Sequence, residues 1–230
     1  MRAGPRPHGA DNLTPADRFR KLRHLTNHWA RPGGPRAYYW YLTFENAVQL
    51  HDLAARCQQA ISLPHYDLTP RQGMHLTLDR VAYEKDTTPD DLRALTAAAV
   101  KACADIPAFD LTIGGLGGTS GAIGFEAGPH EPTTHLRDTL RAAALAAHPR
   151  ATPRGTGFHA HVAIAYCNTD GVPADQTVAA LGQLGTLPRV TVTITEASLV
   201  LLERGPRAYL WHTVARIPLA TAMAADRPDR

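Results

Sequence analysis

Two apolar stretches of the sequence contain histidine where a strand packed into a core has no need of a polar side chain. In the first, GMHLTLDR, His75 is followed at steps of two residues by Thr77 and Asp79. In the second, GFHAHVAIAY, His161 leads into a run of small and branched apolar residues. Residues two apart on a strand point to the same face, so the polar side chains of each stretch share one face and the apolar ones pack on the other. The two stretches therefore predict one site assembled from two strands.

Two histidines that face each other across a phosphate can act as an acid–base pair without a metal ion. One neutral imidazole accepts a proton from the attacking water or hydroxyl, and the other, protonated, donates a proton to the departing oxygen. Histidine suits both roles because its unperturbed pKa, about 6.5, lies close to neutral pH. The hydroxyl of Thr77 can donate to a non-bridging phosphate oxygen and stabilise the charge that builds up there. His75 and His161 are therefore the candidate catalytic pair.

The elements that must position these histidines alternate between strand and helix patterns along the chain. Strands are predicted over residues 37–44, 74–83, 109–118, 120–128, 158–166, 189–204 and 208–219, and helices over residues 45–61, 88–106, 132–148 and 173–184. The helix over 88–106 has the clearest start, because Thr88 is a good cap, Pro89 suits the first helical position and two aspartates follow. The order of elements suggests two loosely repeated halves, with one histidine strand at a corresponding place in each.

The two histidine motifs resemble those of the 2H phosphoesterase superfamily, in particular its 2′-5′ RNA ligase-like and cyclic nucleotide phosphodiesterase branch. That superfamily is defined by two copies of His-x-Thr/Ser-x, in which x is hydrophobic. The tetrapeptide HLTL, which begins at His75, fits the first copy fully. The tetrapeptide HVAI, which begins at His161, fits the second except that Ala163 replaces the hydroxyl residue. The resemblance covers about residues 37 to 216 and rests on two motifs, each on a predicted strand.

The resemblance implies a bilobal, duplicated α+β fold, in which antiparallel sheets line a central cleft and helices lie outside. It implies a metal-independent phosphoesterase without a cofactor, acting on a 2′,3′-cyclic phosphate or 2′-5′ phosphodiester of a nucleotide or RNA end. By the same resemblance His75 and His161 are catalytic, Thr77 binds the substrate phosphate, and Ala163 marks a second hydroxyl position that is lost here. Losing such a donor costs a few kcal/mol of transition-state stabilisation. The alternative is therefore a weakened member that binds a nucleotide or RNA end without efficient turnover.

Three further residues are candidate substrate contacts. Arg154 precedes the second histidine strand and could reach a phosphate, although a solvated loop arginine is an equal alternative. Tyr166 closes the second motif and could stack on a base or simply pack. His159 shares a face with His161, and either lines the cleft beside it or caps the strand entrance in solvent.

A metal site is another interpretation of the His159-x-His161 pair. Two imidazoles on one face of a strand are common among metal ligands, and Asp79 or His75 could supply a further ligand. No cluster of carboxylates flanks the pair, so a metal-dependent hydrolase is the less favoured alternative. The glycine-rich residues 114–121 lack the GK[ST] ending of a phosphate-binding loop and lead into no helix, so they are expected to form a hairpin turn.

Composition narrows the class of protein further. The chain has 230 residues, is 44% hydrophobic and has a formal net charge of +3. Its basic residues are scattered, which is not typical of a sequence-independent nucleic-acid binder. Its three cysteines are far apart and fit neither a disulfide framework nor a zinc ribbon. With no signal-peptide pattern and no long apolar run, we expect a cytoplasmic protein that binds no membrane and has no obligate protein partner.

The ends of the chain differ in composition from the middle. We expect a flexible extension over residues 1–30, a single bilobal domain over residues 31–220, and a flexible tail over residues 221–230. Proline, glycine and arginine dominate the first residues, and charged residues and proline the last. Within the extension, residues 15–29 form a short basic amphipathic segment that could be helical.

Overall fold

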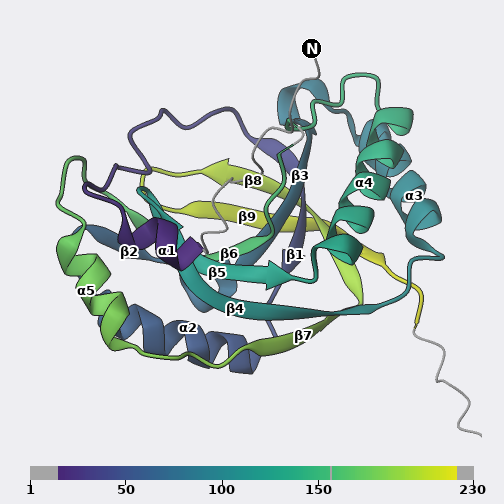
Figure 1. Ribbon diagram of the computed structural model, residues 1–230. Helices are drawn as coiled ribbons and strands as arrows, with labels where there is room; N and C mark the ends of the chain where they lie inside the picture. Colours follow the sequence, from purple (N-terminus) through teal and green to yellow (C-terminus); the bar gives the residue numbers. More distant parts are fainter. Residues whose placement is uncertain (1–14, 156, 222–230) are drawn as a thin grey trace, which may run out of the picture.

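Two antiparallel sheets, each assembled from strands far apart in the chain, form the centre of the molecule (Figure 1). The computed structural model describes residues 15–155 and 157–221. The first sheet has the order β3-β1-β8-β9 and consists of β1 (Ala37–Thr43), β3 (His75–Tyr83), β8 (Glu196–Arg204) and β9 (Tyr209–Pro218). The second has the order β2-β6-β5-β4-β7 and consists of β2 (Tyr66–Leu68), β4 (Phe109–Thr119), β5 (Ala122–Gly128), β6 (His161–Cys167) and β7 (Val190–Ile194). The predicted α+β fold is confirmed, and each histidine motif lies in a different sheet.

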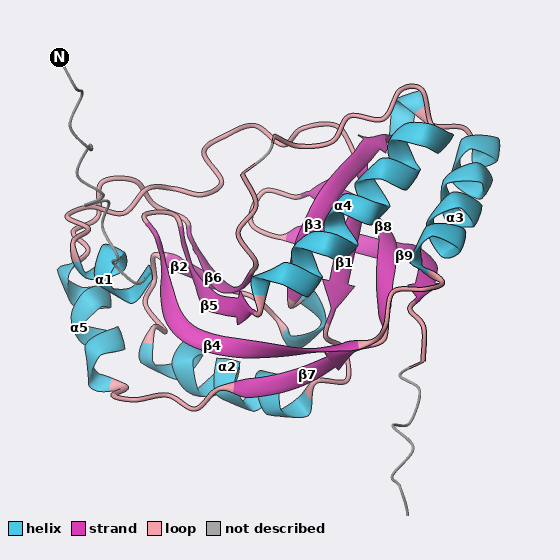
Figure 2. Ribbon diagram, turned by 45° about the vertical axis from the view of Figure 1, so that its right-hand side comes forward, coloured by secondary structure: helices cyan, strands magenta, loops and turns pink. Residues whose placement is uncertain are grey.

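Helices pack around the two sheets (Figure 2). They are α1 (Pro15–Arg20), α2 (Val48–Ala60), α3 (Pro89–Cys103), α4 (His130–Ala147) and α5 (Asp175–Gln183), with 3₁₀ turns at Arg71–Gly73 and Glu84–Asp86. α3 and α4 pack side by side on the first sheet, whereas α2 packs on β6 and β7 of the second. The start of α3 is as predicted, because the Thr88 hydroxyl accepts a hydrogen bond from the backbone N–H of Asp91. None of these helices, within the described chain, is long and apolar enough to cross a membrane.

The histidine strands bury the faces that their alternation predicted. Leu76 on β3 and Val162 on β6, each directly after a motif histidine, have no exposed surface. Both belong to the main core, which also contains Trp40 of β1 and Phe125 of β5. Because one face of each strand is fixed in this core, the histidines one residue earlier are turned away from it.

The prediction of one continuous strand over residues 189–204 is wrong. β7 ends at Ile194 and pairs with β4 in the second sheet, whereas β8 begins at Glu196 and pairs with β1 in the first. The chain therefore passes directly from one sheet to the other at Thr195. Both halves are rich in β-branched and aliphatic residues, so composition contains no signal of the change of sheet. The three-residue strand β2 was not predicted either.

The segment that precedes β1 is packed against the second sheet. Leu25 has no exposed surface, and its backbone N–H donates over 2.8 Å to the carbonyl oxygen of Val172, in the loop before α5. The backbone N–H groups of Thr26 and His28 donate over 2.9 and 2.8 Å to the carbonyl oxygens of Ser120 and Cys167, at the ends of β4 and β6. We call residues 21–36 the strap. Of the expected flexible extension, residues 1–14 lie outside the described residues, residues 15–20 form α1, which packs against β4, and residues 21–30 belong to the strap. The helix expected over residues 15–29 is short, ending at Arg20. In the expected tail, residues 222–230 lie outside the described residues.

Candidate active site

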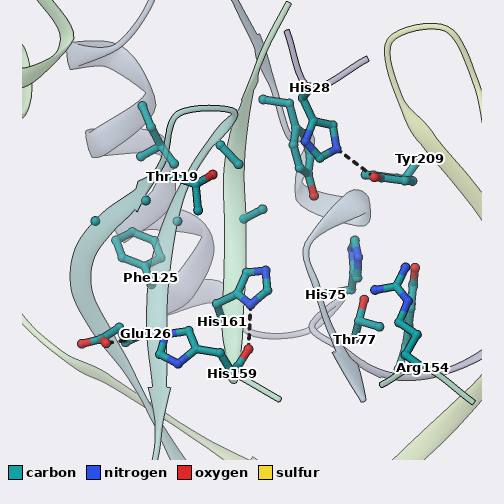
Figure 3. A pocket seen from close by; sticks show the side chains of 18 of the residues that line it. His28, His75, Thr77, Thr119, Phe125, Glu126, Arg154, His159, His161 and Tyr209 are labelled. Carbon is teal, nitrogen blue, oxygen red and sulfur yellow. Dashed lines mark hydrogen bonds and ion pairs between the residues drawn. The ribbon is translucent and has the colours of Figure 1, made fainter. Parts of the chain in front are cut away.

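A cleft of about 480 Å³ lies between the two sheets, and both motif histidines line it. His75 comes from β3 of the first sheet and His161 from β6 of the second. Figure 3 shows the two side chains on opposite walls of the cleft. The two histidines are 86 positions apart in the sequence, yet they line one cleft. A site assembled from these two strands was expected from the sequence.

The two imidazoles are held by the same kind of hydrogen bond. Nδ1 of His75 lies 2.9 Å from the carbonyl oxygen of Gly73, and Nδ1 of His161 lies 2.8 Å from the carbonyl oxygen of His159. A carbonyl only accepts, so in both rings Nδ1 is the protonated nitrogen and donates. Across the described part of the chain, Nε2 of neither ring has a hydrogen-bond partner. Each histidine is therefore oriented by the backbone two residues before it, and its Nε2 is available to a ligand.

The surroundings of the two histidines differ. Tyr41 stacks on the His75 ring at a centroid distance of 4.3 Å, and Trp211 meets its edge at 4.8 Å. Burial lowers the pKa of His75 from 6.5 to about 4, and the positive fields of His161 and Arg154 act in the same direction. His161, by contrast, lies on an exposed part of the cleft wall. At neutral pH the free protein therefore presents His75 as a neutral ring, ready to accept a proton.

The second residue of each motif also faces the cleft. Thr77 lines it beside His75, and Ala163 lines it beside His161. Ala163 lies opposite Gly124 of β5, where a Cβ atom on the glycine would come within 2.5 Å of the Val162 carbonyl oxygen. The glycine thus allows β5 and β6 to approach closely at the position where the hydroxyl is missing.

Tyr166 lies on the cleft wall because β6 contains an irregularity. Side chains alternate between the two faces of a regular strand, and Tyr166 is five positions after His161. In a regular strand the two side chains would therefore lie on opposite faces. The register between β5 and β6 shifts at Ile123 and Gly124, so that Ile164 has no partner of its own. The shift reverses the alternation and places Tyr166 in the lining with His161.

Arg154 reaches the cleft from the loop before β6. Its guanidinium lies over the Tyr39 ring, 5.1 Å from the centroid, and Nη2 donates to the Tyr39 hydroxyl over 3.4 Å. His159 also lines the cleft, at an exposed position where its Nε2 lies 3.7 Å from Glu126. His159 is therefore both a lining residue of the cleft and an exposed residue.

Asp79 does not share the face of His75 and Thr77, and this expectation from strand alternation is wrong. The pairing of β1 with β3 shifts between Trp40 and Tyr41, so one extra residue of β3 reverses the face. Asp79 is 1% exposed and is turned toward α4 instead.

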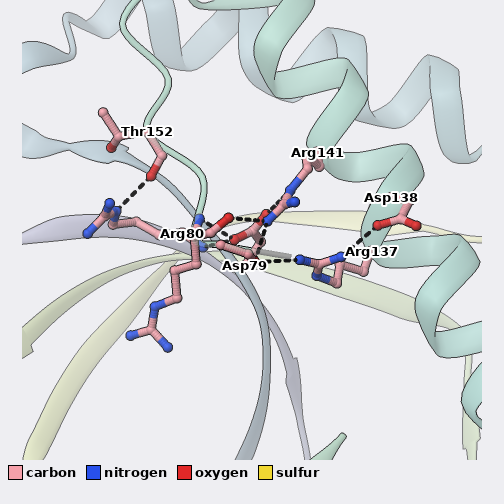
Figure 4. A network of polar contacts seen from close by, with 8 residues as sticks. Asp79, Arg80, Arg137, Asp138, Arg141 and Thr152 are labelled. Atoms are coloured by element: carbon pink, nitrogen blue, oxygen red, sulfur yellow. Dashed lines mark hydrogen bonds and ion pairs between the residues drawn. The ribbon is translucent and has the colours of Figure 1, made fainter. Parts of the chain in front are cut away.

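A buried network around Asp79 holds the loop that presents Arg154 (Figure 4). The carboxylate accepts from Nε of Arg141 over 2.5 Å and from the backbone N–H groups of Arg80 and Arg154, both over 2.9 Å. Nη2 of Arg141 donates to the carbonyl oxygen of Arg154 over 2.6 Å, and Nε of Arg80 donates to that of Thr152 over 2.8 Å. Asp79 thus connects β3, α4 and the Arg154 loop.

The metal alternative gains no further ligand from this arrangement. Within residues 15–155 and 157–221, no group of three or more histidine, cysteine, aspartate or glutamate side chains could hold a metal ion. Asp79, one of the two further ligands considered, is paired with Arg141.

Comparison with known families places the chain. A family model described as the 2'-5' RNA ligase superfamily matches residues 49–206, more than half of the sequence. The chain belongs to the 2'-5' RNA ligase superfamily. The resemblance to 2H phosphoesterases that the two motifs indicated is thereby confirmed.

Solved structures share the fold of this superfamily member at low sequence identity. TT0787 of Thermus thermophilus aligns with a TM-score of 0.61 and 15% identity, over 81% of this chain and 100% of that one. LigT of E. coli, in complex with 3'-AMP, aligns with a TM-score of 0.58 and 17% identity, over 81% and 99%. The PDE domain of MHV ns2 aligns with a TM-score of 0.52 and 11% identity, over 75% and 100%. At these identities the likeness shows the fold alone. No curated protein sequence matches the chain.

Several cleft residues were not predicted from the sequence, among them two that precede the first strand. His28 and Arg31 belong to the strap and line the same cleft as the motif histidines. Nε2 of His28 lies 2.8 Å from the Tyr209 hydroxyl, and the His28 ring packs on Tyr166 at a centroid distance of 4.4 Å. Burial, followed by the positive fields of Arg204 and Arg31, lowers the pKa of His28 to about 4. No motif or spacing in the sequence connected this segment with the site.

Proposed function

We propose that this superfamily member is a metal-independent phosphoesterase that opens a 2′,3′-cyclic phosphate, or cleaves a 2′-5′ phosphodiester, of a nucleotide or RNA end. The observation that carries the proposal is the pair of imidazoles on opposite walls of one cleft, each oriented by its own Nδ1–carbonyl hydrogen bond. Acid–base catalysis on a phosphate needs one nitrogen that accepts a proton and one that donates a proton, both facing the space that the phosphate occupies. The two Nε2 atoms meet this requirement.

The asymmetry of the pair suggests how the roles are divided. His75 is neutral at neutral pH because burial lowers its pKa to about 4. Its Nε2 would accept the proton of the attacking water as the water oxygen bonds to phosphorus. The P–O bond to the departing ribose oxygen then breaks, and that oxygen takes a proton from Nε2 of a protonated His161. An anionic phosphate between the rings opposes the positive fields that lower the pKa of His75, so binding of substrate strengthens the base.

Two other groups would stabilise the phosphate itself. The Thr77 hydroxyl lies on the same strand as His75, and the Arg154 guanidinium enters from the loop. Arginine presents several N–H donors in a planar fork that suits phosphate oxygens. Both groups would therefore bind non-bridging oxygens, where negative charge increases in the transition state.

Aromatic side chains make a nucleoside the expected remainder of the substrate. Tyr166, Tyr209 and Phe125 line the cleft, and aromatic rings are the usual partners of unpaired bases. The related E. coli LigT has been solved with 3'-AMP, with NADP+ and with ATP. A nucleotide in this cleft is consistent with those complexes.

A second candidate function follows from Ala163. A member that lacks one motif hydroxyl could bind a nucleotide or RNA end and turn it over inefficiently. The intact first motif and the matching geometry of both histidines favour the enzyme.

A panel of 2′,3′-cyclic mononucleotides, assayed with and without EDTA, tests the proposal. We expect release of the 2′- or 3′-phosphate that continues at an unchanged rate in EDTA. Binding without turnover would support the weakened member instead. Turnover that EDTA abolishes and a divalent metal restores would point to a metal-dependent hydrolase and overturn the proposed mechanism.

Replacing Ala163 by threonine should restore the missing donor. The residue lines the cleft beside His161, so the new hydroxyl can reach a phosphate oxygen. One hydrogen bond to a charged group is worth enough to raise phosphate affinity or turnover by about tenfold. Ala163→Val is the matched control, because valine has the same shape without the hydroxyl. If both variants lose activity equally, the alanine instead makes room for substrate; if neither changes activity, this position does not contact the phosphate.

A further inference from the structure

The strap brings side chains into the cleft from outside the part of the chain that matches the superfamily. The match begins at residue 49, whereas His28 and Arg31 precede even the first strand. The core of the fold therefore supplies the two histidines, and an additional segment supplies further groups on the same cleft.

The strap is fixed in place by several independent contacts. Nε1 of Trp29 donates to Asp67 over 2.9 Å, and Asp67 is also paired with Arg207. Arg204 donates to backbone carbonyls of the strap, among them that of Arg31 over 2.6 Å. Its buried Leu25 and its backbone bonds to the ends of β4 and β6 anchor the other half. A segment held this firmly places its side chains at defined positions on the cleft wall.

The cleft contains more positive charge than one phosphodiester needs. Among the described residues its lining includes Arg31 as well as Arg154, but a single acidic residue, Glu126, whose carboxylate lies beside His159. A phosphodiester carries one negative charge, and Arg154 with Thr77 already accounts for it. In the described residues, no carboxylate lies within ion-pair distance of Arg31.

Arg31 lies on the strap three residues after His28, and Arg204 donates to the backbone carbonyl groups of both residues. The positive fields of Arg204 and Arg31 also lower the pKa of His28, whereas the field of Arg154 reaches His75 and Tyr209. Arg154 is further tied to Tyr39 of β1. Arg31 therefore enters the cleft from the part of the strap at which His28 packs on Tyr166 and bonds to Tyr209.

We propose that the strap forms a second phosphate-binding subsite, with Arg31 as its donor, so that the preferred substrate carries a phosphate in addition to the reacting one. This inference rests on the proposed function. The reacting phosphate occupies the 2′ and 3′ oxygens of its ribose, so the second phosphate must be attached on the 5′ side. The substrate class is then a nucleoside 2′,3′-cyclic phosphate that carries either a 5′-phosphate or a 5′-linked nucleotide.

Three substrates test the subsite: adenosine 2′,3′-cyclic phosphate with a free 5′-hydroxyl, the same nucleotide with a 5′-phosphate, and an adenylyl dinucleotide that ends in a 2′,3′-cyclic phosphate. Because Arg31 is exposed, we expect a modest gain, with kcat/KM about three- to tenfold higher when a second phosphate is present. A gain with the 5′-phosphate alone identifies a small nucleotide, and a gain with the dinucleotide identifies an RNA end.

The ratio of kcat/KM with the second phosphate to kcat/KM without it measures the subsite. Arg31→Ala should bring this ratio to about one, whereas Arg23→Ala should leave it as in the wild type. Arg23 is the matched control, because it lies on the strap, is exposed and does not line the cleft. A wild-type ratio near one, or a ratio that Arg31→Ala leaves unchanged, would overturn the subsite.

A binding measurement separates this inference from the proposed function. Calorimetry compares adenosine 3′-phosphate with adenosine 3′,5′-bisphosphate, neither of which requires turnover. Tighter binding of the bisphosphate that Arg31→Ala removes would support the subsite even if no cyclic phosphate were hydrolysed. Equal binding of both nucleotides to the wild type, together with no gain in kcat/KM for the dinucleotide, would reject the subsite.

Discussion

His75→Ala and His161→Ala are each expected to lower kcat/KM on a cyclic phosphate by about 10²–10⁴-fold, the usual contribution of one positioned proton-transfer group. The physical reason is the same for both residues: each presents an Nε2 atom to the cleft while Nδ1 is held by a backbone carbonyl. Because the two groups act on one transition state, the double variant should be little worse than either single variant. Steady-state rates with the cyclic nucleotide panel measure the effect.

The matched control is His212→Ala, which removes an exposed histidine of β9 that does not line the cleft. It should retain full activity. His75 packs against Tyr41 and Trp211, so thermal unfolding followed by circular dichroism must show that His75→Ala remains folded. A folded His75 or His161 variant with near-wild-type turnover would remove that residue from the mechanism.

Sequence periodicity was enough to predict which face of each histidine strand is buried. The apolar alternation after His75 and His161 predicted which face of each strand is buried, and burial of Leu76 and Val162 bears this out. The two motifs also predicted that a site would draw on both strands. These features depend on local spacing, which a sequence displays directly.

Features that depend on single inserted residues could not be predicted in this way. One extra residue in β3 turns Asp79 away from the cleft, and one in β6 turns Tyr166 toward it. Each reverses a face without changing the composition of the strand. The junction at Thr195 is of the same kind, because nothing in a β-branched run marks where it leaves one sheet for another.

The strap and the Asp79 network depend on long-range contacts. His28 reaches Tyr209 and Asp79 reaches Arg141 only once the sheets and α4 are assembled. Neither segment has a spacing typical of a site. A polar residue such as Asp79, on a strand otherwise rich in apolar residues, indicates that a partner is needed, but its identity comes from the fold.

Asp79→Ala is expected to destabilise the protein by about 3–5 kcal/mol, the cost of removing one partner from a buried ion pair. Asp79 is 1% exposed and the Arg141 side chain is 18% exposed, so the guanidinium that remains would be poorly solvated. The carboxylate also raises the pKa of Arg141 and accepts the backbone N–H groups of Arg80 and Arg154. Chemical denaturation, with stability extrapolated to water, measures the change. Asp52→Asn is the matched control: its side chain is 70% exposed and pairs with Arg71, which is 65% exposed, and such exposed pairs contribute about 0–1 kcal/mol.

Asp79→Asn distinguishes the positioning role of this residue from its role in stability. Asparagine keeps the volume and one acceptor oxygen but loses the charge that pairs with Arg141. The chain should fold, because the side chain still fills its site and its oxygen can still accept from the backbone N–H groups of Arg80 and Arg154. The amide NH2 would instead face Nε of Arg141, a donor against a donor, so Arg141 is displaced and the loop over residues 152–155 loses the bond from Arg141 to the Arg154 carbonyl. If Arg154 binds the reacting phosphate, KM should then rise, and inorganic phosphate should inhibit less strongly, while His75 and His161 remain in place. A folded Asp79→Asn protein with unchanged KM and unchanged inhibition by phosphate would show that the network stabilises the fold without positioning Arg154 for the substrate.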